Sequence, residues 1–388
     1  MLAIICLYVF TIFMVYQSFP PILSLLIKDL GLSHSEAGLL AAIFCLPGIF
    51  LTIPLSFYST RIGMKRLGIM SIILLAAGSV VVASANSFSM LLAGRIIAGL
   101  GAVALPFAGL EAVAQWFAEY RTGFAMGIYS TCMLGGVIVS LSTFGTVGVN
   151  LGWQASIWIT VGVCAVALIL YATVFKNPPL HDEQASGQVS HPARQLFSLG
   201  WPVWILGMCW ALFNLANISV VTFSPDLMYQ NGFNLGLAGF FTSIMLIVTV
   251  ILSPFTGHLL DRMRYKELLN LIGSVFCVVL SFLMPGNIGV IVLIIIGMGI
   301  ATTPFASVTF AMVPTLVKPG MLAMAYAVVT TLCNAAFLIG PYLTGFIRDA
   351  TGSYTYSYQV IALFYLMVTL LTGASLLMQL KRNRAAQG

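Results

Sequence analysis

The feature that most constrains this chain is one helix–loop–helix passage that occurs twice, about 200 residues apart. A shift of 201 residues aligns EAGLLAAIFCLPGIFLTIPLSFYSTRIGMKR (36–66) with LAGFFTSIMLIVTVILSPFTGHLLDRMRYKE (237–267), so that an Ala-Gly pair, an arginine and a lysine coincide. A shift of 198 aligns GLGAVALPFA (99–108) with GMGIATTPFA (297–306). The chain therefore consists of two halves whose elements follow in the same order, an architecture suited to moving a solute between two faces.

The composition places these halves in a lipid bilayer. Hydrophobic residues make up 60% of the 388 residues, charged residues 7%, and the mean hydropathy is +1.05. A soluble protein of this length could not bury so much apolar surface. A bilayer core needs about 20 apolar residues per helix. The spans expected on this basis are 2–27, 36–59, 66–85, 89–115, 122–149, 153–175, 199–227, 236–259, 267–284, 288–316, 321–346 and 356–380. The predicted fold is all-α and integral to the membrane, with twelve helices in two pseudo-symmetric six-helix bundles.

One polar stretch divides the chain. Residues 176–198 are rich in proline, charged and polar residues, and they fall between the sixth and seventh spans. We predict an N-terminal six-helix bundle at 1–175, a cytoplasmic linker at 176–198, a C-terminal six-helix bundle at 199–380 and a cytoplasmic tail at 381–388.

The distribution of lysine and arginine explains the net charge of +6. The predicted spans leave most of the sixteen basic residues on the side of the two termini, Lys28 and Arg348 on the other side, and Arg95 within a span. Because cytoplasmic loops carry the excess of lysine and arginine, both termini are expected in the cytoplasm of a multi-pass protein of the cell (inner) membrane. The positive charge is thus no sign of a nucleic-acid partner.

The sequence gives no support for catalysis. Its seven cysteines lie in apolar runs without C-x-x-C spacing, its four histidines form no metal-spaced pair, and no phosphate-binding G-x-x-x-x-G-K-[ST] loop is present. We expect no enzyme activity, no catalytic residue, no metal site and no cofactor, and transport driven by a gradient rather than by ATP.

The loops after spans two and eight carry a recognisable pattern. The second copy runs from Gly257 through Asp261 and Arg262 to Lys266, and span four adds Arg95 followed by Gly99 and Gly101. This pattern resembles the G-x-x-x-D-R-x-G-x-K/R signature of the major facilitator superfamily. The ending of span eleven looks like those of its anion and organic-acid branches. The resemblance implies two bundles around a central cavity that opens alternately to each side. It also implies a monomer that binds a small-molecule substrate, with or without a coupling proton or ion, in the lipid bilayer.

The first copy of the loop departs from the family pattern. In the family, an aspartate after span two helps to latch the two halves on the cytoplasmic side, and Thr60 cannot supply that charge. Glu111 is expected near the cytoplasmic end of span four, either paired with a nearby basic residue or as a titrating carboxylate. The residues considered for the cytoplasmic latch are Thr60, Arg61, Lys65, Glu111, Asp261, Arg262 and Lys266.

Arg95 is the clearest candidate for handling substrate. A charge in the bilayer is costly, by about 2.5–3.5 kcal/mol on insertion scales. The shift of 198 puts Leu293 at the matching position of the second half. A guanidinium can hold an oxyanion through two N–H bonds. In the family, however, the arginine at this position often braces span four against span one. Both readings are open at this point.

Neutral polar residues complete the candidate substrate site. Trp210, Asn214 and Asn217 share one face of span seven at i, i+4 and i+7, where the asparagines serve either helix packing or the ligand. No carboxylate lies in the middle of spans one, seven or ten, which disfavours proton antiport. The remaining candidates are Gln17 and Tyr16 on span one, Phe107 on span four, Thr302 on span ten and Asn334 on span eleven.

The leading hypothesis is a secondary active or facilitative transporter that moves a small organic or inorganic anion by rocker-switch alternating access, with Arg95 as counter-charge. The alternatives are proton-coupled efflux of drugs or other lipophilic solutes, facilitated transport of a neutral solute such as a sugar or peptide, and a transport-inactive sensor on the same fold.

Overall fold

The computed structural model describes residues 1–117, 122–177, 199–263, 265–286, 288–317 and 321–385. These residues are almost entirely helical, and no strand occurs among them. Ten of their helices are long and apolar enough to cross a membrane. Two shorter apolar helices, α6 (Phe88–Ala102) and α13 (Glu267–Leu283), occupy the fourth and ninth predicted spans. The prediction of an all-helical membrane protein is confirmed, and a helical segment covers each predicted span.

The helices pack into two compact units, each described here on its own. The first unit comprises 1–190 and Thr222–Ser243, and the second comprises His191–Val221 and Ile244–Gly388. Packing thus assigns the end of α11 (Trp201–Gln230) and the start of α12 (Leu235–Arg262) to the first unit. The predicted boundaries at 175 and 199 follow the order of the repeats along the chain, and they remain a prediction.

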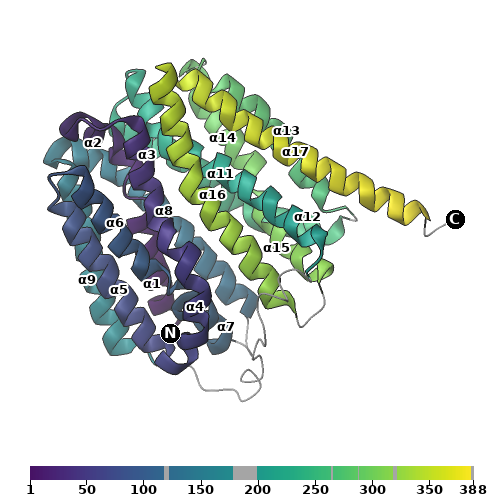
Figure 1. The fold of residues 1–388 in the computed structure, drawn as a ribbon, viewed down its shortest axis with the longest axis horizontal. Coiled ribbons are helices and arrows are strands. Elements are labelled where there is room, and N and C mark those ends of the chain that lie inside the picture. Colours follow the sequence, from purple (N-terminus) through teal and green to yellow (C-terminus); the bar gives the residue numbers. More distant parts are fainter. Residues whose placement is uncertain (118–121, 178–198, 264, 287, 318–320, 386–388) are drawn as a thin grey trace. The chain divides into compact units, whose positions relative to one another are not determined.

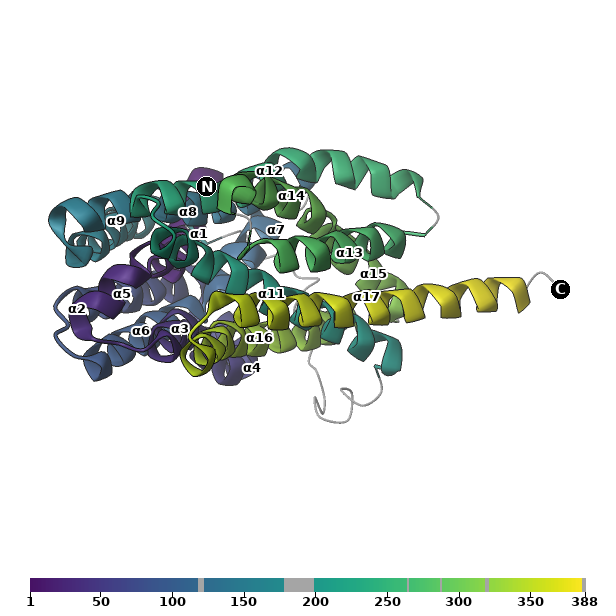
Figure 2. The ribbon, with the colours of Figure 1, turned by 90° about the horizontal axis from the view of Figure 1, so that it is seen from above.

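In the first unit, α5, α6 and α9 lie side by side, and α1 packs along α8 and α9 (Figures 1 and 2). Three of its spans are interrupted by short tight or wide turns. Its elements are α1 (Leu2–Tyr16), η1 (Pro20–Ile22), α2 (Leu23–Leu30), α3 (His34–Ala42), η2 (Ile43–Cys45), α4 (Leu46–Ile62), α5 (Met64–Ala83), α6, the π-helical η3 (Pro106–Glu111), α7 (Ala112–Trp116), α8 (Thr122–Leu151) and α9 (Trp153–Val174).

In the second unit, α13 packs along α17 and also contacts α14 and α15 (Figure 2). Residues up to Val221 of α11 and from Ile244 of α12 belong to this unit. The remaining elements are α11 (Trp201–Gln230), α12 (Leu235–Arg262), α13, η5 (Ile288–Val290), α14 (Ile291–Thr302), α15 (Pro304–Leu316), α16 (Leu322–Thr351) and α17 (Tyr354–Ala385).

Two neighbouring glycines of α8 differ sharply in their surroundings. A Cβ atom at Gly136 would overlap the carbonyl oxygen of Phe10 in α1, whereas one at Gly135 would meet ring atoms of Phe10 at 3.7 and 3.8 Å, an ordinary contact. We expect Gly136→Ala to destabilise the protein by about 1–3 kcal/mol through overpacking. Gly135→Ala, the matched control, should be neutral or slightly stabilising. Thermal unfolding of the two purified variants tests this, and equal melting temperatures would contradict it.

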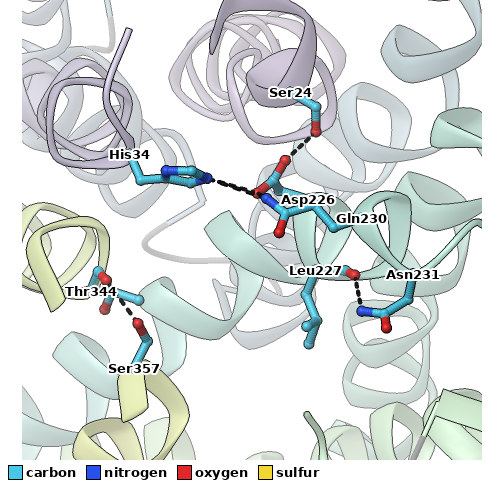
Figure 3. A network of polar contacts seen from close by, with 8 residues as sticks. All are labelled: Ser24, His34, Asp226, Leu227, Gln230, Asn231, Thr344 and Ser357. Atoms are coloured by element: carbon cyan, nitrogen blue, oxygen red, sulfur yellow. Dashed lines mark hydrogen bonds and ion pairs between the residues drawn. The ribbon is translucent and has the colours of Figure 1, made fainter. Parts of the chain in front are cut away.

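The internal repeat is visible in a hydrogen bond that both units make. Ser156 at the start of α9 donates to the carbonyl of Phe144 in α8 at 2.9 Å. Ser357 at the start of α17 donates to the carbonyl of Thr344 in α16 at 3.1 Å (Figure 3). The two serines are 201 residues apart and the two acceptors 200. The pairs α8–α9 and α16–α17 therefore share this contact to within one residue.

The fourth and tenth spans also have a common packing point. A Cβ atom at Gly99 would overlap the carbonyl oxygen of Phe44, and one at Gly299 would lie 2.7 Å from the carbonyl oxygen of Met245. Phe44 and Met245 are 201 residues apart, and the two glycines 200. Up to this point the packing therefore follows a shift of 200, not 198.

This register corrects the counterpart of Arg95. A shift of 200 pairs Arg95, 1% exposed, with Ile295, also 1% exposed, whereas Leu293 is 67% exposed. The shift of 198 relates the residues that follow the break in each span, where Pro106 corresponds to Pro304. Three residues separate α6 from Pro106, but Thr303 alone separates α14 from Pro304, so the register changes by two there.

Candidate functional site

Arg95 lies in α6 and is 1% exposed, and its guanidinium is surrounded by backbone carbonyls. Its Nη1 donates to Val15 at 2.9 Å and its Nη2 to Tyr16 at 3.0 Å, both at the end of α1. Its Nε donates to Leu40 and its Nη2 to Ala41, each at 3.0 Å, near the end of α3. Four of the five N–H groups of this arginine are thus used to join three spans.

The sequence explains why these carbonyls accept from a side chain. In a continuous helix the carbonyl of Tyr16 would accept from the N–H of residue 20, and that of Gln17 from residue 21, but both positions are proline. Arg95 donates to the first carbonyl, and Ser140 of α8 donates to the second at 2.6 Å. The ends of α1 and α3 also carry the negative pole of their helix dipoles, which favours a cation there.

The rings of Phe19 and Phe44 flank the guanidinium, with centroids 4.6 and 4.9 Å from its central carbon. Among the described residues, the partners of Arg95 are neutral carbonyls and these two rings, and no carboxylate contacts it. The geometry is that of a brace between spans, and the full positive charge is retained.

The structure brings Tyr16 and Gln17 to the same junction. Both side chains are buried, and the Tyr16 ring lies 5.3 Å from that of Phe44. Ser140 donates to the backbone carbonyl of Gln17, but the side-chain amide of Gln17 makes no hydrogen bond among the described residues. Its amide therefore remains a candidate ligand for a solute.

In the second unit, α11 carries the three predicted candidates Trp210, Asn214 and Asn217. Asn214 is buried and donates to the carbonyl of Trp210 in its own helix at 2.8 Å. The Oδ1 atom of Asn217 is buried and has no hydrogen-bond partner among the described residues. Trp210 packs against Phe213 and Phe310. Asn214 thus uses its amide donor within its own helix, and Asn217 has a buried acceptor without a partner among the described residues.

The weaker candidates on spans ten and eleven are placed as follows. Thr302 is buried and donates to the carbonyl of Met298 in its own helix at 2.8 Å. Asn334 is half-buried in α16. The side chain of Phe107 lies outside the described part of the chain.

The candidates for the cytoplasmic latch are only partly described. The side chains of Thr60, Arg61 and Asp261 lie outside the described residues, and Arg262 is exposed. Glu111 accepts a hydrogen bond from Gln115 of its own helix turn at 3.0 Å. The backbone N–H of Lys65 donates to the side chain of Asn177 at 2.9 Å, and Lys266 is half-buried before α13. The latch therefore stays a prediction.

Sequence reasoning missed a polar cluster centred on Asp226. Helix α11 continues to Gln230, so Asp226 lies within the helix, and its side chain is 2% exposed. Ser24 of α2 donates to its Oδ1, and Gln230 donates to its Oδ2 at 2.8 Å (Figure 3). The Nε2 atom of His34, at the start of α3, lies 3.6 Å from the same Oδ2. We call Ser24, His34, Asp226 and Gln230 the Asp226 cluster. An acidic residue near the end of an apolar span was the available signal.

Close backbone packing accompanies the Asp226 cluster. A Cβ atom at Gly145 of α8 would lie 2.8 Å from the carbonyl oxygen of Leu235, and one at Gly239 of α12 would overlap the carbonyl oxygen of Leu141. Within the first unit, residues 222–243 are therefore held to α2, α3 and α8 by polar contacts and by glycine-mediated packing.

The duplicated helical halves and the buried arginine between spans are typical of a membrane transporter. The family model of the Major Facilitator Superfamily matches residues 5–303 and 211–387. The chain belongs to the Major Facilitator Superfamily, which confirms the resemblance seen in its loops.

Curated relatives are similar at low identity. The chain is 24% identical to the "Nitrite extrusion protein" of Bacillus subtilis (strain 168), and the match covers 66% of this chain and 64% of that protein. It is 23% identical to the "Probable sulfoacetate transporter SauU" of Cupriavidus necator, with coverage of 92% and 89%. The first of these matches thus spans slightly less than two thirds of the relative.

Solved structures confirm the fold. A bacterial homolog of the human lysosomal transporter Spinster superposes with a TM-score of 0.81 at 14% identity, covering 96% of this chain and 95% of the other. A D323A mutant of the nucleoside transporter NupG superposes with a TM-score of 0.80 at 14% identity, covering 96% of this chain and 99% of the other.

Proposed function

We propose that this protein transports a small organic or inorganic anion across the cell membrane by alternating access. The observation that carries the proposal is the retained charge of Arg95. Its carbonyl partners are neutral, so a net positive potential extends from the junction of spans one, two and four. In a low-dielectric surrounding this potential attracts an anion without direct contact.

The relatives support the same class of solute. The names of the two relatives reported above refer to nitrite and to sulfoacetate, which are both anions. We infer that Arg95 positions spans one and two and supplies the field, while Gln17 and Asn217 offer polar contacts to the solute. A direct contact between Arg95 and the anion remains the alternative for this residue.

The Asp226 cluster is proposed as the outer gate. The distribution of lysine and arginine orients both termini toward the cytoplasm, which puts the end of α2 and the end of α11 on the outer side. The cluster links spans one and two of the first half to span seven of the second half. Its contacts have to open whenever the outer side admits solute.

The proposal is tested by transport in liposomes containing the purified full-length chain. We expect uptake of nitrate, nitrite or sulfoacetate at least about tenfold above protein-free liposomes. An imposed gradient of the same anion should drive exchange in either direction. Uptake of a sugar serves as the control for leakage.

Other outcomes of this assay would replace the proposal. Proton-driven movement of lipophilic cations without anion transport would support efflux of lipophilic solutes, which the buried carboxylate of Asp226 also allows. Transport of sugars or peptides alone would support a facilitator of neutral solutes. A folded protein that moves none of these solutes would support a transport-inactive sensor.

A further inference from the structure

The interior of the second unit contains a cavity of about 400 Å3. This volume falls in the range of small-molecule sites, roughly 300–1,000 Å3. The cavity lies among the ends of helices that the charge distribution orients toward the cytoplasm. Its wall is formed by the first third of α11, the first turn of α13, most of α15 and the second half of α17.

In the first unit, two tyrosines pack against each other at positions that correspond to part of the cavity wall. The rings of Tyr8 in α1 and Tyr171 in α9 lie 5.4 Å apart, and both residues are at most 1% exposed. Tyr171 also stacks on Phe175 at 4.4 Å. A shift of 201, the one that relates Ser156 to Ser357, relates Tyr8 to Cys209 and Tyr171 to Thr372.

The second unit has a smaller pair at the corresponding point. Cys209 and Thr372 both line the cavity. Two aromatic rings in one half thus correspond to a thiol and a small hydroxyl in the other. The two smaller side chains form part of the cavity wall.

The polar part of the cavity wall includes a carboxylate and an amide, beside the hydroxyl groups of Thr309, Thr315, Thr372 and Ser375. Glu267 and Asn270, at i and i+3 on the first turn of α13, are 6% and 7% exposed and both line the cavity. The Oδ1 atom of Asn270 has no hydrogen-bond partner in the described part of the chain. An acceptor buried without a partner costs about 1–3 kcal/mol.

The rest of the wall is apolar and aromatic. Trp201, Trp210 and Phe305 line the cavity together with Met312 and Leu316. A carboxylate and an amide oxygen beside aromatic rings suit a group that carries N–H donors and a positive charge, because rings attract cations over their faces. The size and apolar lining favour an organic molecule over a bare metal ion.

We propose that this cavity is a binding site for a small organic ammonium ion, held by Glu267 and Asn270 against the aromatic wall. The site is internal to the second unit. It is distinct from the junction around Arg95 and does not depend on which solute is transported.

The test uses the purified full-length chain with 2-phenylethylamine as the probe. The neutral 2-phenylethanol, the anionic 3-phenylpropionate and sodium chloride serve as comparisons. We expect the amine alone to raise the melting temperature by several degrees and to change the tryptophan fluorescence with a measurable Kd. Glu267→Gln should weaken amine binding at least about tenfold, and Asn270→Leu should also weaken it.

A cavity-filling variant makes the test independent of the polar residues. Thr372→Tyr restores the ring that Tyr171 provides in the first unit, so it should abolish amine binding while the melting temperature without ligand stays equal or rises. Leu370→Tyr is the matched control, because Leu370 lies on the same helix and is 65% exposed. This variant should bind the amine as the parent chain does.

Three results would overturn the proposal. No binding of the amine up to about 10 mM would remove the site. Binding that survives Thr372→Tyr would place the amine elsewhere. Equal stabilisation by the alcohol, or by sodium chloride alone, would exclude an organic ammonium ion as the preferred ligand.

Discussion

Arg95→Gln is expected to lower the melting temperature of the purified protein by roughly 10 °C in the absence of any anion. Glutamine reaches fewer partners than the guanidinium, so carbonyls at the ends of α1 and α3 lose their donor. Each buried acceptor left without a partner costs about 1–3 kcal/mol, and one kcal/mol corresponds to about 2–4 °C in a large chain. Arg95→Lys retains the charge, so its melting temperature should fall between those of the parent protein and Arg95→Gln. Arg66→Gln is the control, because Arg66 is exposed.

The same variants separate the two roles of Arg95. A brace predicts a lower melting temperature whether or not an anion is present. A direct ligand predicts an unchanged melting temperature without anion and loss only of the stabilisation that nitrate or sulfoacetate provides. Full anion transport by a well-folded Arg95→Gln protein would contradict the assignment of its charge to the anion.

Asp226→Ala is expected to loosen the outer gate. The change removes the acceptor of Ser24 and Gln230 and the ion-pair partner of His34 at once. Hydrogen bonds to a charged group contribute about 1.5–3 kcal/mol each, and 1.4 kcal/mol is a factor of ten in population. Amide exchange in 18–36 and 222–239, followed by mass spectrometry, should therefore accelerate at least about tenfold.

Asp29→Asn provides the matched control for the outer gate. Asp29 lies at the opposite end of α2 from Ser24, and it accepts a hydrogen bond from Trp153 of the first half at 2.8 Å. Its loss should leave exchange in 222–239 unchanged. If Asp226→Ala exchanged at the parental rate and transported at the parental rate, the cluster would be packing without a gating role.

Much of the fold could be predicted from the sequence because bilayer burial leaves a one-dimensional pattern. Apolar runs of sufficient length predicted all twelve spans, and the repeat in the loop after span two predicted the duplication. The loop pattern also predicted the family, which the family model confirms. These features depend on residues close in sequence, so they can be read without coordinates.

The chemistry of the candidate site depended on contacts between residues far apart in sequence. Arg95 was recognisable as a buried charge, but only the packing showed that its donors meet the carbonyls that Pro20 and the turn at η2 leave free. Sequence analysis did not single out Asp226, because its partners Ser24 and His34 lie about 200 residues earlier in the chain. In the wall of the cavity beside Glu267, Cys209 and Thr372 occupy the positions that correspond to two packed tyrosines in the other half.

The sequence by itself thus determined the membrane class, the number and order of the helices and the family. The tertiary structure decided which polar side chains are satisfied, which remain open to a ligand and which hold spans together. The physical reason is that the apolarity of a span is a sum over its own residues. The free energy of a buried polar group instead depends on its partners, and those partners come from other helices.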